Sequence, residues 1–154
     1  MVLAMETPEA TASAIIDFVE RLEDDSLAFY EKLAERFPMH KAVFLSFVGD
    51  VKKNKASVIR TYRETITDAL EACFSFKGLN LNDYMIKTNI AENSSFSDAL
   101  KVAVRLEEEA SEFYTDVAEQ CKSLLATIPR AFKAVADERN RRKQRLESLL
   151  HNAK

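Results

Sequence analysis

The chain is poor in the residues that form tight turns and phosphate-binding loops. Only 2 glycines and 3 prolines occur among its 154 residues. These leave little material for the turns of β-sandwiches and barrels, or for the glycine-rich loops of nucleotide-binding folds. Long helices with few connections are therefore the favoured architecture. The length suits one domain built around one hydrophobic core.

The chain also has few cysteines and a small net charge. The 2 cysteines, Cys73 and Cys121, form no CxxC pair, which excludes a disulfide scaffold and a four-cysteine metal centre. We expect both thiols to be reduced in a cytoplasmic protein. No basic segment precedes an apolar run near Met1, and no stretch approaches the roughly 20 apolar residues of a membrane span, so we expect no signal peptide and no membrane partner. A formal net charge of −3 gives no general attraction to nucleic acid.

Apolar residues recur at three- and four-residue spacing through four long segments, and this period predicts helices. The short links within each half predict two antiparallel hairpins. Together they predict an all-α four-helix bundle that forms a single domain over residues 1–154. An irregular all-helical array is the alternative. The expected helices cover about residues 8–36, 39–72, 96–125 and 128–150, with a long crossover over 73–95.

Several residues mark the expected ends of these helices. Thr7 is a good N-cap, and Pro8 suits the first helical position. Pro38 should end the first helix, because proline disfavours a helical residue before it. Residues 95–98, with the sequence Ser-Phe-Ser-Asp, resemble a capping box at the start of the third helix. A short helix is expected within the crossover, at about residues 81–87.

The two halves of the chain resemble each other. A shift of 84 positions places Arg21–Tyr30 on Arg105–Tyr114, with identical Arg, Leu, Glu, Phe and Tyr at the same spacing. A shift of 88 places Phe44 on Phe132, with weaker agreement around it. The two hairpins are therefore interpreted as copies of one unit. The general likeness of amphipathic helices is the alternative explanation.

Each repeat also carries a glutamate inside its apolar stripe. Glu23 lies seven positions before Tyr30, and Glu107 lies seven positions before Tyr114, on the same helical face in each case. Burying an unpaired carboxylate costs several kcal/mol, so each needs a cation or a proton. The cation could be a metal, an arginine or a lysine, and the tyrosine hydroxyl can donate a hydrogen bond.

Over about residues 14–150, the chain resembles the rubrerythrin branch of the ferritin-like di-iron proteins. In that family the first and third helices each carry a glutamate seven residues before a tyrosine, as in Glu23/Tyr30 and Glu107/Tyr114. The second and fourth helices each carry a Glu-x-x-His pair, and the six residues ligate two irons that react with O2 or peroxide. The resemblance implies a ferritin-like bundle in which Glu23 and Glu107 are metal-ligand positions and both tyrosines lie behind them. By analogy it also implies a homodimer.

The second half of the family pattern fails in this chain. Val51 and Asn54 stand in the Glu and His positions of the second helix, and Arg139 and Arg142 stand in those of the fourth. Four of the six expected ligands are therefore replaced.

Other ligands are not obvious. The only 2 histidines, His40 and His151, pair with no acid on a core face and are expected at the surface. A one-residue slip would make Asp50 and Glu138 ligands instead, but it would turn apolar neighbours off the core face.

Arg139 lies on the inward stripe of the fourth helix, and arginine stays charged in any protein interior. We hypothesise that Arg139, helped by Arg142, bridges Glu23 and Glu107 where the metals would sit. In the alternative, both arginines reach out to water, and the basic run Arg139–Arg145 is a solvated face. Nucleic-acid contact by that run is disfavoured, because the net charge is acidic and no aromatic residues interleave it.

Three functional hypotheses follow. The favoured one is a rubrerythrin-like bundle that has lost its di-iron centre, needs no cofactor, and acts as a non-catalytic structural, regulatory or partner-binding protein. The alternative is a metal-binding oxidoreductase, a peroxidase, oxidase or iron-handling protein, whose rearranged site uses Glu23 and Glu107 with iron or another divalent metal. A third is a bundle that binds an apolar small molecule in its core.

Overall fold

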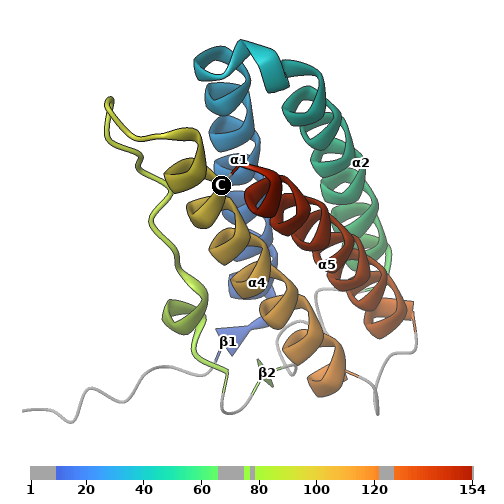
Figure 1. Cartoon of the computed structure of the whole chain (residues 1–154). Helices are drawn as coiled ribbons and strands as arrows, with labels where there is room; N and C mark the ends of the chain where they lie inside the picture. Colours follow the sequence, from blue (N-terminus) through green and yellow to red (C-terminus); the bar gives the residue numbers. More distant parts are fainter. Residues whose placement is uncertain (1–9, 66–74, 77–78, 122–126, 154) are drawn as a thin grey trace, which may run out of the picture.

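The computed structural model describes residues 10–65, 75–76, 79–121 and 127–153. Within these residues the protein is built almost entirely of helix, and four long α-helices make up the body of the molecule (Figure 1). Their bounds are α1 Ala12–Arg36, α2 Lys41–Thr65, α4 Phe96–Cys121 and α5 Thr127–Asn152.

The first helix starts later than its sequence predicts. Thr11 has an extended backbone, and its hydroxyl accepts a hydrogen bond from the Ala14 amide at 3.1 Å, so α1 begins at Ala12 and not near residue 8. Thr11 rather than Thr7 is therefore the N-cap of this helix. Thr7 and Pro8 lie outside the described residues.

The remaining elements are short. Strand β1 (Ala10–Thr11) pairs antiparallel with β2 (Ser75–Phe76), a pairing that the sequence analysis did not foresee. There are two short 3₁₀ helices among the described residues, η1 (Pro38–His40) and η2 (Leu81–Tyr84). The helix expected over 81–87 is thus a single shorter turn of 3₁₀ type.

The other helix ends agree with the sequence where the structure describes them. Helix α1 ends at Arg36, before Pro38, as predicted. The Ser95 hydroxyl accepts a hydrogen bond from the Asp98 amide at 3.0 Å, which confirms the expected cap of α4. The expected ends of the second and third helices, at 72 and 125, lie outside the described residues.

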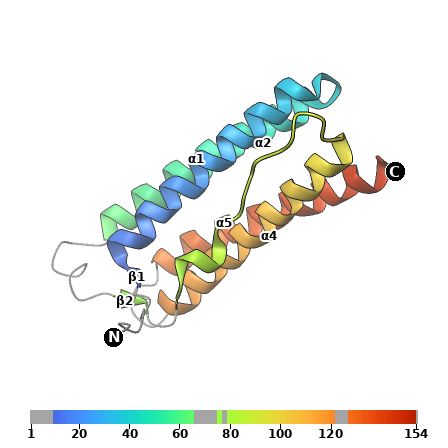
Figure 2. The same cartoon turned by 90° about the vertical axis from the view of Figure 1, so that its left-hand side faces the viewer.

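The helices pack as two hairpins. α1 packs against α2, α4 packs against α5, and α2 contacts α5 across the bundle. The described part of the crossover runs along the bundle and brings the start of α4 beside η1 (Figure 2). There Arg36 donates a hydrogen bond to the carbonyl of Ala91 at 2.9 Å, and the rings of Phe37 and Phe96 lie 5.2 Å apart. The predicted all-α bundle of two hairpins and a long crossover is confirmed.

This route of the chain makes α1 and α4 antiparallel (Figure 2). The core between the hairpins is lined by leucine, valine and aromatic side chains from all four helices. Six polar or charged side chains of the described residues are buried among them: Glu23, Ser26, Glu107, Ser111, Arg139 and Arg142. None of the described helices has both the length and the apolar composition needed to cross a membrane.

Candidate functional site: a buried charge cluster

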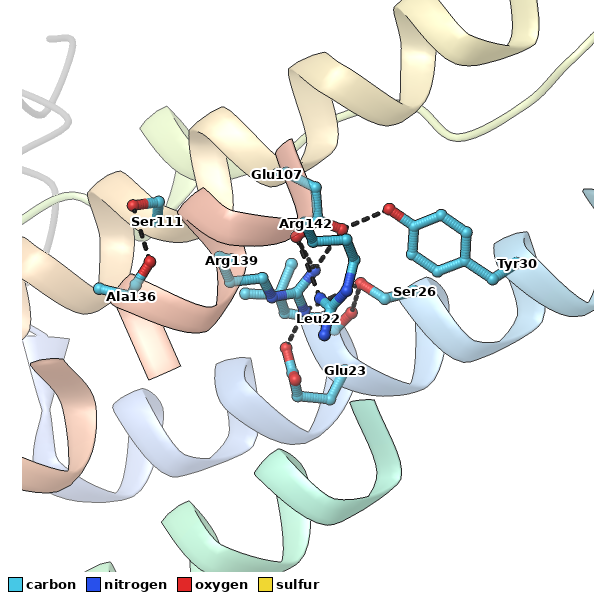
Figure 3. Close-up of polar contacts among 9 residues, drawn as sticks. All are labelled: Leu22, Glu23, Ser26, Tyr30, Glu107, Ser111, Ala136, Arg139 and Arg142. Carbon is cyan, nitrogen blue, oxygen red and sulfur yellow. Dashed lines mark hydrogen bonds and ion pairs between the residues drawn. The ribbon is translucent and has the colours of Figure 1, made fainter. Parts of the chain in front are cut away.

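Four charged side chains meet in the middle of the bundle (Figure 3). Glu23 comes from α1, Glu107 from α4, and Arg139 and Arg142 from α5; we call these four residues the charge cluster. The first three are fully buried, and Arg142 is 4% exposed. Two carboxylates face two guanidiniums, so the formal charges of the cluster cancel.

The apolar stripe of α5 explains why its arginines point inward. Phe132 and Val135 precede Arg139 on this face and Leu146 follows it, and all three are buried. Arg139 must therefore enter the core with its neighbours. The alternative in which Arg139 and Arg142 extend into water is wrong.

Arg139 joins the two glutamates, as the sequence analysis hypothesised. Its Nη1 donates to both carboxylate oxygens of Glu107 at 3.1 Å each, and its Nη2 donates to Oε2 of Glu23. Nη2 also donates to the Ser26 hydroxyl at 3.1 Å. Burial alone lowers the pKa of Arg139, but the carboxylates of Glu107 and Glu23 outweigh it and hold that pKa above its ordinary value. The guanidinium is therefore a permanent cation between two acids.

Glu107 is the more completely bonded of the two carboxylates. Besides Arg139, it accepts a hydrogen bond from Nη1 of Arg142 at 3.1 Å and another from the Tyr30 hydroxyl. Burial, and then the negative charge of Glu107, raise the pKa of Tyr30 well above its ordinary value. Tyr30 is thus a protonated donor to this carboxylate.

Glu23 has fewer partners. Its Oε1 atom is buried with no hydrogen-bond partner, and so are the Tyr114 hydroxyl and the Asn54 side-chain nitrogen. Burial, and then the charge of Glu23, raise the pKa of Tyr114 well above its ordinary value. Val51, which the shift of 88 positions relates to Arg139, is an ordinary buried core residue. The two halves of the repeat are therefore unequal in their polar contacts.

Sequence reasoning missed two serines and one role of a phenylalanine. The Ser26 hydroxyl donates to the Leu22 carbonyl at 2.8 Å and accepts from Arg139, so it orients the guanidinium. The sequence did offer one signal for this role: Ser26 lies on the apolar stripe, three residues after Glu23. The Ser111 hydroxyl donates to the Ala136 carbonyl at 3.3 Å and ties α4 to α5.

Phe47 of α2 was expected to serve packing only. The guanidiniums of Arg142 and Arg145 lie over its ring at 5.7 and 5.6 Å from the centroid. Phe47 therefore also supports Arg142 through a cation–π contact.

The other candidate ligands lie away from the cluster. Asp50 is exposed, and Glu138 pairs with the exposed Arg141, so the one-residue slip of the helices is wrong. His40 stacks on Phe96 with centroids 4.1 Å apart, which makes it partly buried at the end of the bundle. His151 is exposed, as expected.

The residues of the cluster do not fit a di-iron centre. Across the described ranges, no three or more His, Cys, Asp or Glu side chains come together as a metal would require. The two carboxylates present, Glu23 and Glu107, already share a guanidinium that donates to both. A metal ion would have to displace a fixed positive charge from this position.

The buried tyrosines lead to a prediction at alkaline pH. A raised pKa in the folded state means that their contribution to stability is complete below the unfolded pKa of about 10 and is lost as the pH rises above it. We expect Tyr30 and Tyr114 to ionise only when the bundle unfolds. Urea unfolding at about pH 9 and about pH 11 should show a fall in unfolding free energy that is smaller in a Tyr30→Phe/Tyr114→Phe variant. An equal fall in both proteins would contradict this.

Comparison of the chain with family models, with curated proteins and with solved structures gives no match. The resemblance to rubrerythrins therefore depends on the sequence motifs described above, and it stays a prediction.

Proposed function

We propose that this chain is a ferritin-like bundle of rubrerythrin type in which arginine has replaced the di-iron centre, and that it acts as a non-catalytic, partner-binding protein. The observation that carries the proposal is the fully buried Arg139, which donates to both Glu23 and Glu107. The cluster neutralises its own acids, so the fold needs no metal for charge balance. A cytoplasmic location belongs to the same proposal, because the 2 cysteines suggest no disulfide framework.

Metal analysis tests the absence of an iron centre. Protein purified without chelator should contain no stoichiometric iron or manganese, and its ultraviolet–visible spectrum should be that of an ordinary protein. Anaerobic incubation with iron(II), followed by desalting, should leave both results unchanged. Stoichiometric metal in either sample would favour the oxidoreductase hypothesis instead.

The partner that we propose is a second copy of this chain, bound through the outer face of the α1–α2 hairpin. Two shallow hollows on this face share the half-buried Leu27. The first extends toward η1 and the second toward the far end of α2. Their other lining residues are Asp24, Ala28, Glu31, Lys32, Ala34, Glu35, Lys41 and Leu45 in the first, and Lys52, Lys55, Ala56, Ile59, Arg60 and Arg63 in the second.

The charges of the two hollows complement each other. The first hollow carries three acids against two lysines, whereas the second carries four basic residues and no acid. Asp24 pairs with Lys55 and Arg63 with Glu20 inside one chain, so Glu31 and Glu35 of the first hollow and Lys52 and Arg60 of the second are the charges that would meet across the axis. A two-fold axis near Leu27 would place the first hollow of one copy on the second hollow of the other. That arrangement would also cover Leu45, which is 45% exposed, and Ile59.

We therefore expect the wild-type protein to be a homodimer in light scattering after size exclusion, and Leu27→Glu to be a monomer. Two buried copies of a new carboxylate at the axis would repel each other without a partner. Met85→Glu, at an exposed apolar residue of the crossover, is the matched control and should remain dimeric. A monomeric wild type would contradict the dimer, and a dimeric Leu27→Glu variant would contradict this face.

A further inference from the structure

A third hollow, which we call the α2–α5 hollow, lies between these two helices and shares no residue with the proposed dimer face. Its volume is about 190 Å³, below the roughly 300–1,000 Å³ of pockets that hold drug-sized molecules, so it suits a smaller ligand. Five of its six lining residues are charged. The lining consists of Phe47, Asp50, Glu138, Arg141, Arg142 and Arg145.

Two of the arginines in this hollow already have carboxylate partners. Arg141 pairs with Glu138 on the same helix. Arg142 donates from Nη1 to Glu107 at 3.1 Å, and its other nitrogens make no hydrogen bond within the described residues. The guanidinium of Arg142 therefore keeps donors for a ligand in the hollow that it lines.

The two remaining charges, Asp50 and Arg145, are opposite in sign and have no ion-pair partner among the described residues. Both side chains are exposed. They belong to opposite walls of the hollow, because Asp50 lies on α2 and Arg145 lies on α5. The Arg145 guanidinium lies over the Phe47 ring at 5.6 Å from its centroid, and this cation–π contact keeps it at the hollow. The hollow thus presents a cation on one wall and a carboxylate on the other.

These two charges favour a ligand that carries both signs. A phosphate dianion would be repelled by Asp50, and a simple cation would be repelled by Arg145. A molecule with one carboxylate and one ammonium group satisfies both walls. Its carboxylate accepts hydrogen bonds from Arg145 and Arg142, and its ammonium group donates to Asp50.

We propose that the α2–α5 hollow is a binding site for a small amino acid. The site goes beyond the proposed function and does not depend on it, because neither the dimer face nor the absence of iron enters the argument.

Nuclear magnetic resonance titration of the isotope-labelled protein tests the site with glycine and with γ-aminobutyrate, whose two charges lie farther apart. We expect saturable shifts of the Arg145 Nε–H signal and of the Asp50 amide with at least one of them. Acetate and methylammonium carry one charge each and should bind at least about tenfold more weakly, because each loses a charge-assisted contact. No saturable shift with either amino acid would overturn the proposal. Equally tight binding of acetate, methylammonium or inorganic phosphate would overturn it too.

Neutral variants of the two unpaired residues locate the binding. Asp50→Asn and Arg145→Gln should each weaken binding of the better amino acid by about tenfold. Both side chains are exposed, so the melting temperature should stay close to that of the wild type. Arg130→Gln, at an exposed position of α5 outside the hollow, is the matched control and should bind like the wild type. Wild-type affinity in either Asp50→Asn or Arg145→Gln would overturn the proposal.

Discussion

Replacing Arg139 by methionine should lower the free energy of unfolding by about 3–5 kcal/mol at neutral pH, because removing one partner of a buried ion pair leaves a charge uncompensated. Methionine keeps much of the length and apolar stem of arginine, so the loss reports the charge and its hydrogen bonds. Glu23 would lose its only charged partner in the cluster, and Ser26 would lose a donor. Glu107 would keep Arg142 and Tyr30. Urea unfolding followed by circular dichroism measures the difference.

Arg141→Met is the matched control for this measurement. Arg141 lies on the same helix and also pairs with a glutamate, but its side chain is 64% exposed. Exposed ion pairs contribute little, so the control should change stability by less than about 1 kcal/mol. Similar losses in the two variants would contradict a buried, bridging role for Arg139.

Restoring the family ligands should convert the cluster into an iron site. A variant with Val51→Glu, Asn54→His, Arg139→Glu and Arg142→His would carry, with Glu23 and Glu107, the six ligands implied by the resemblance to rubrerythrins. Its four carboxylates would have no internal cation, so it should be unstable alone and should bind about two iron(II) ions per chain. Its melting temperature should then rise with iron concentration, because a ligand that binds only the folded state stabilises it.

Equilibrium dialysis against iron(II) provides the comparison. The wild type should retain no stoichiometric iron. The six-ligand variant with Glu23→Gln and Glu107→Gln added should lose most of its iron binding, because the proposed resemblance assigns metal ligands to these two positions. A folded six-ligand variant with no more iron than the wild type would show that the likeness to the di-iron family is misleading.

The sequence predicted the parts of this structure that follow from local periodicity. Apolar spacing placed the helices, and the repeat pointed to Glu23 and Glu107 as inward carboxylates. The position of Arg139 on the inward stripe then suggested the bridge, because a buried acid requires a cation. Each of these inferences uses residues within one helix together with one rule about burial.

Features that depend on contacts between distant segments were not predictable in this way. Thr11, the N-cap of α1, is also paired with Ser75 far along the chain, and this pairing is not visible in the local sequence. Ser26 looks like an ordinary helix residue until Arg139 is placed beside it. Phe47 becomes a cation–π partner only when α5 packs on α2.

The inequality of the two halves has the same origin. The sequence shows that arginine and asparagine stand in equivalent positions, at Arg142 and Asn54. The sequence does not show which of the two glutamates accepts more hydrogen bonds. In the structure Glu107 accepts from Tyr30, Arg139 and Arg142, whereas Glu23 accepts from Arg139.

Nuclear magnetic resonance of the Arg139 guanidinium in the wild-type protein tests the bridge most directly. If this group is fixed between both glutamates, its Nη protons should give separate, slowly exchanging signals, with hydrogen-bond couplings to the carboxylates of Glu23 and Glu107. A single averaged Nη signal that exchanges rapidly with water, as in an exposed arginine, would contradict the bridge.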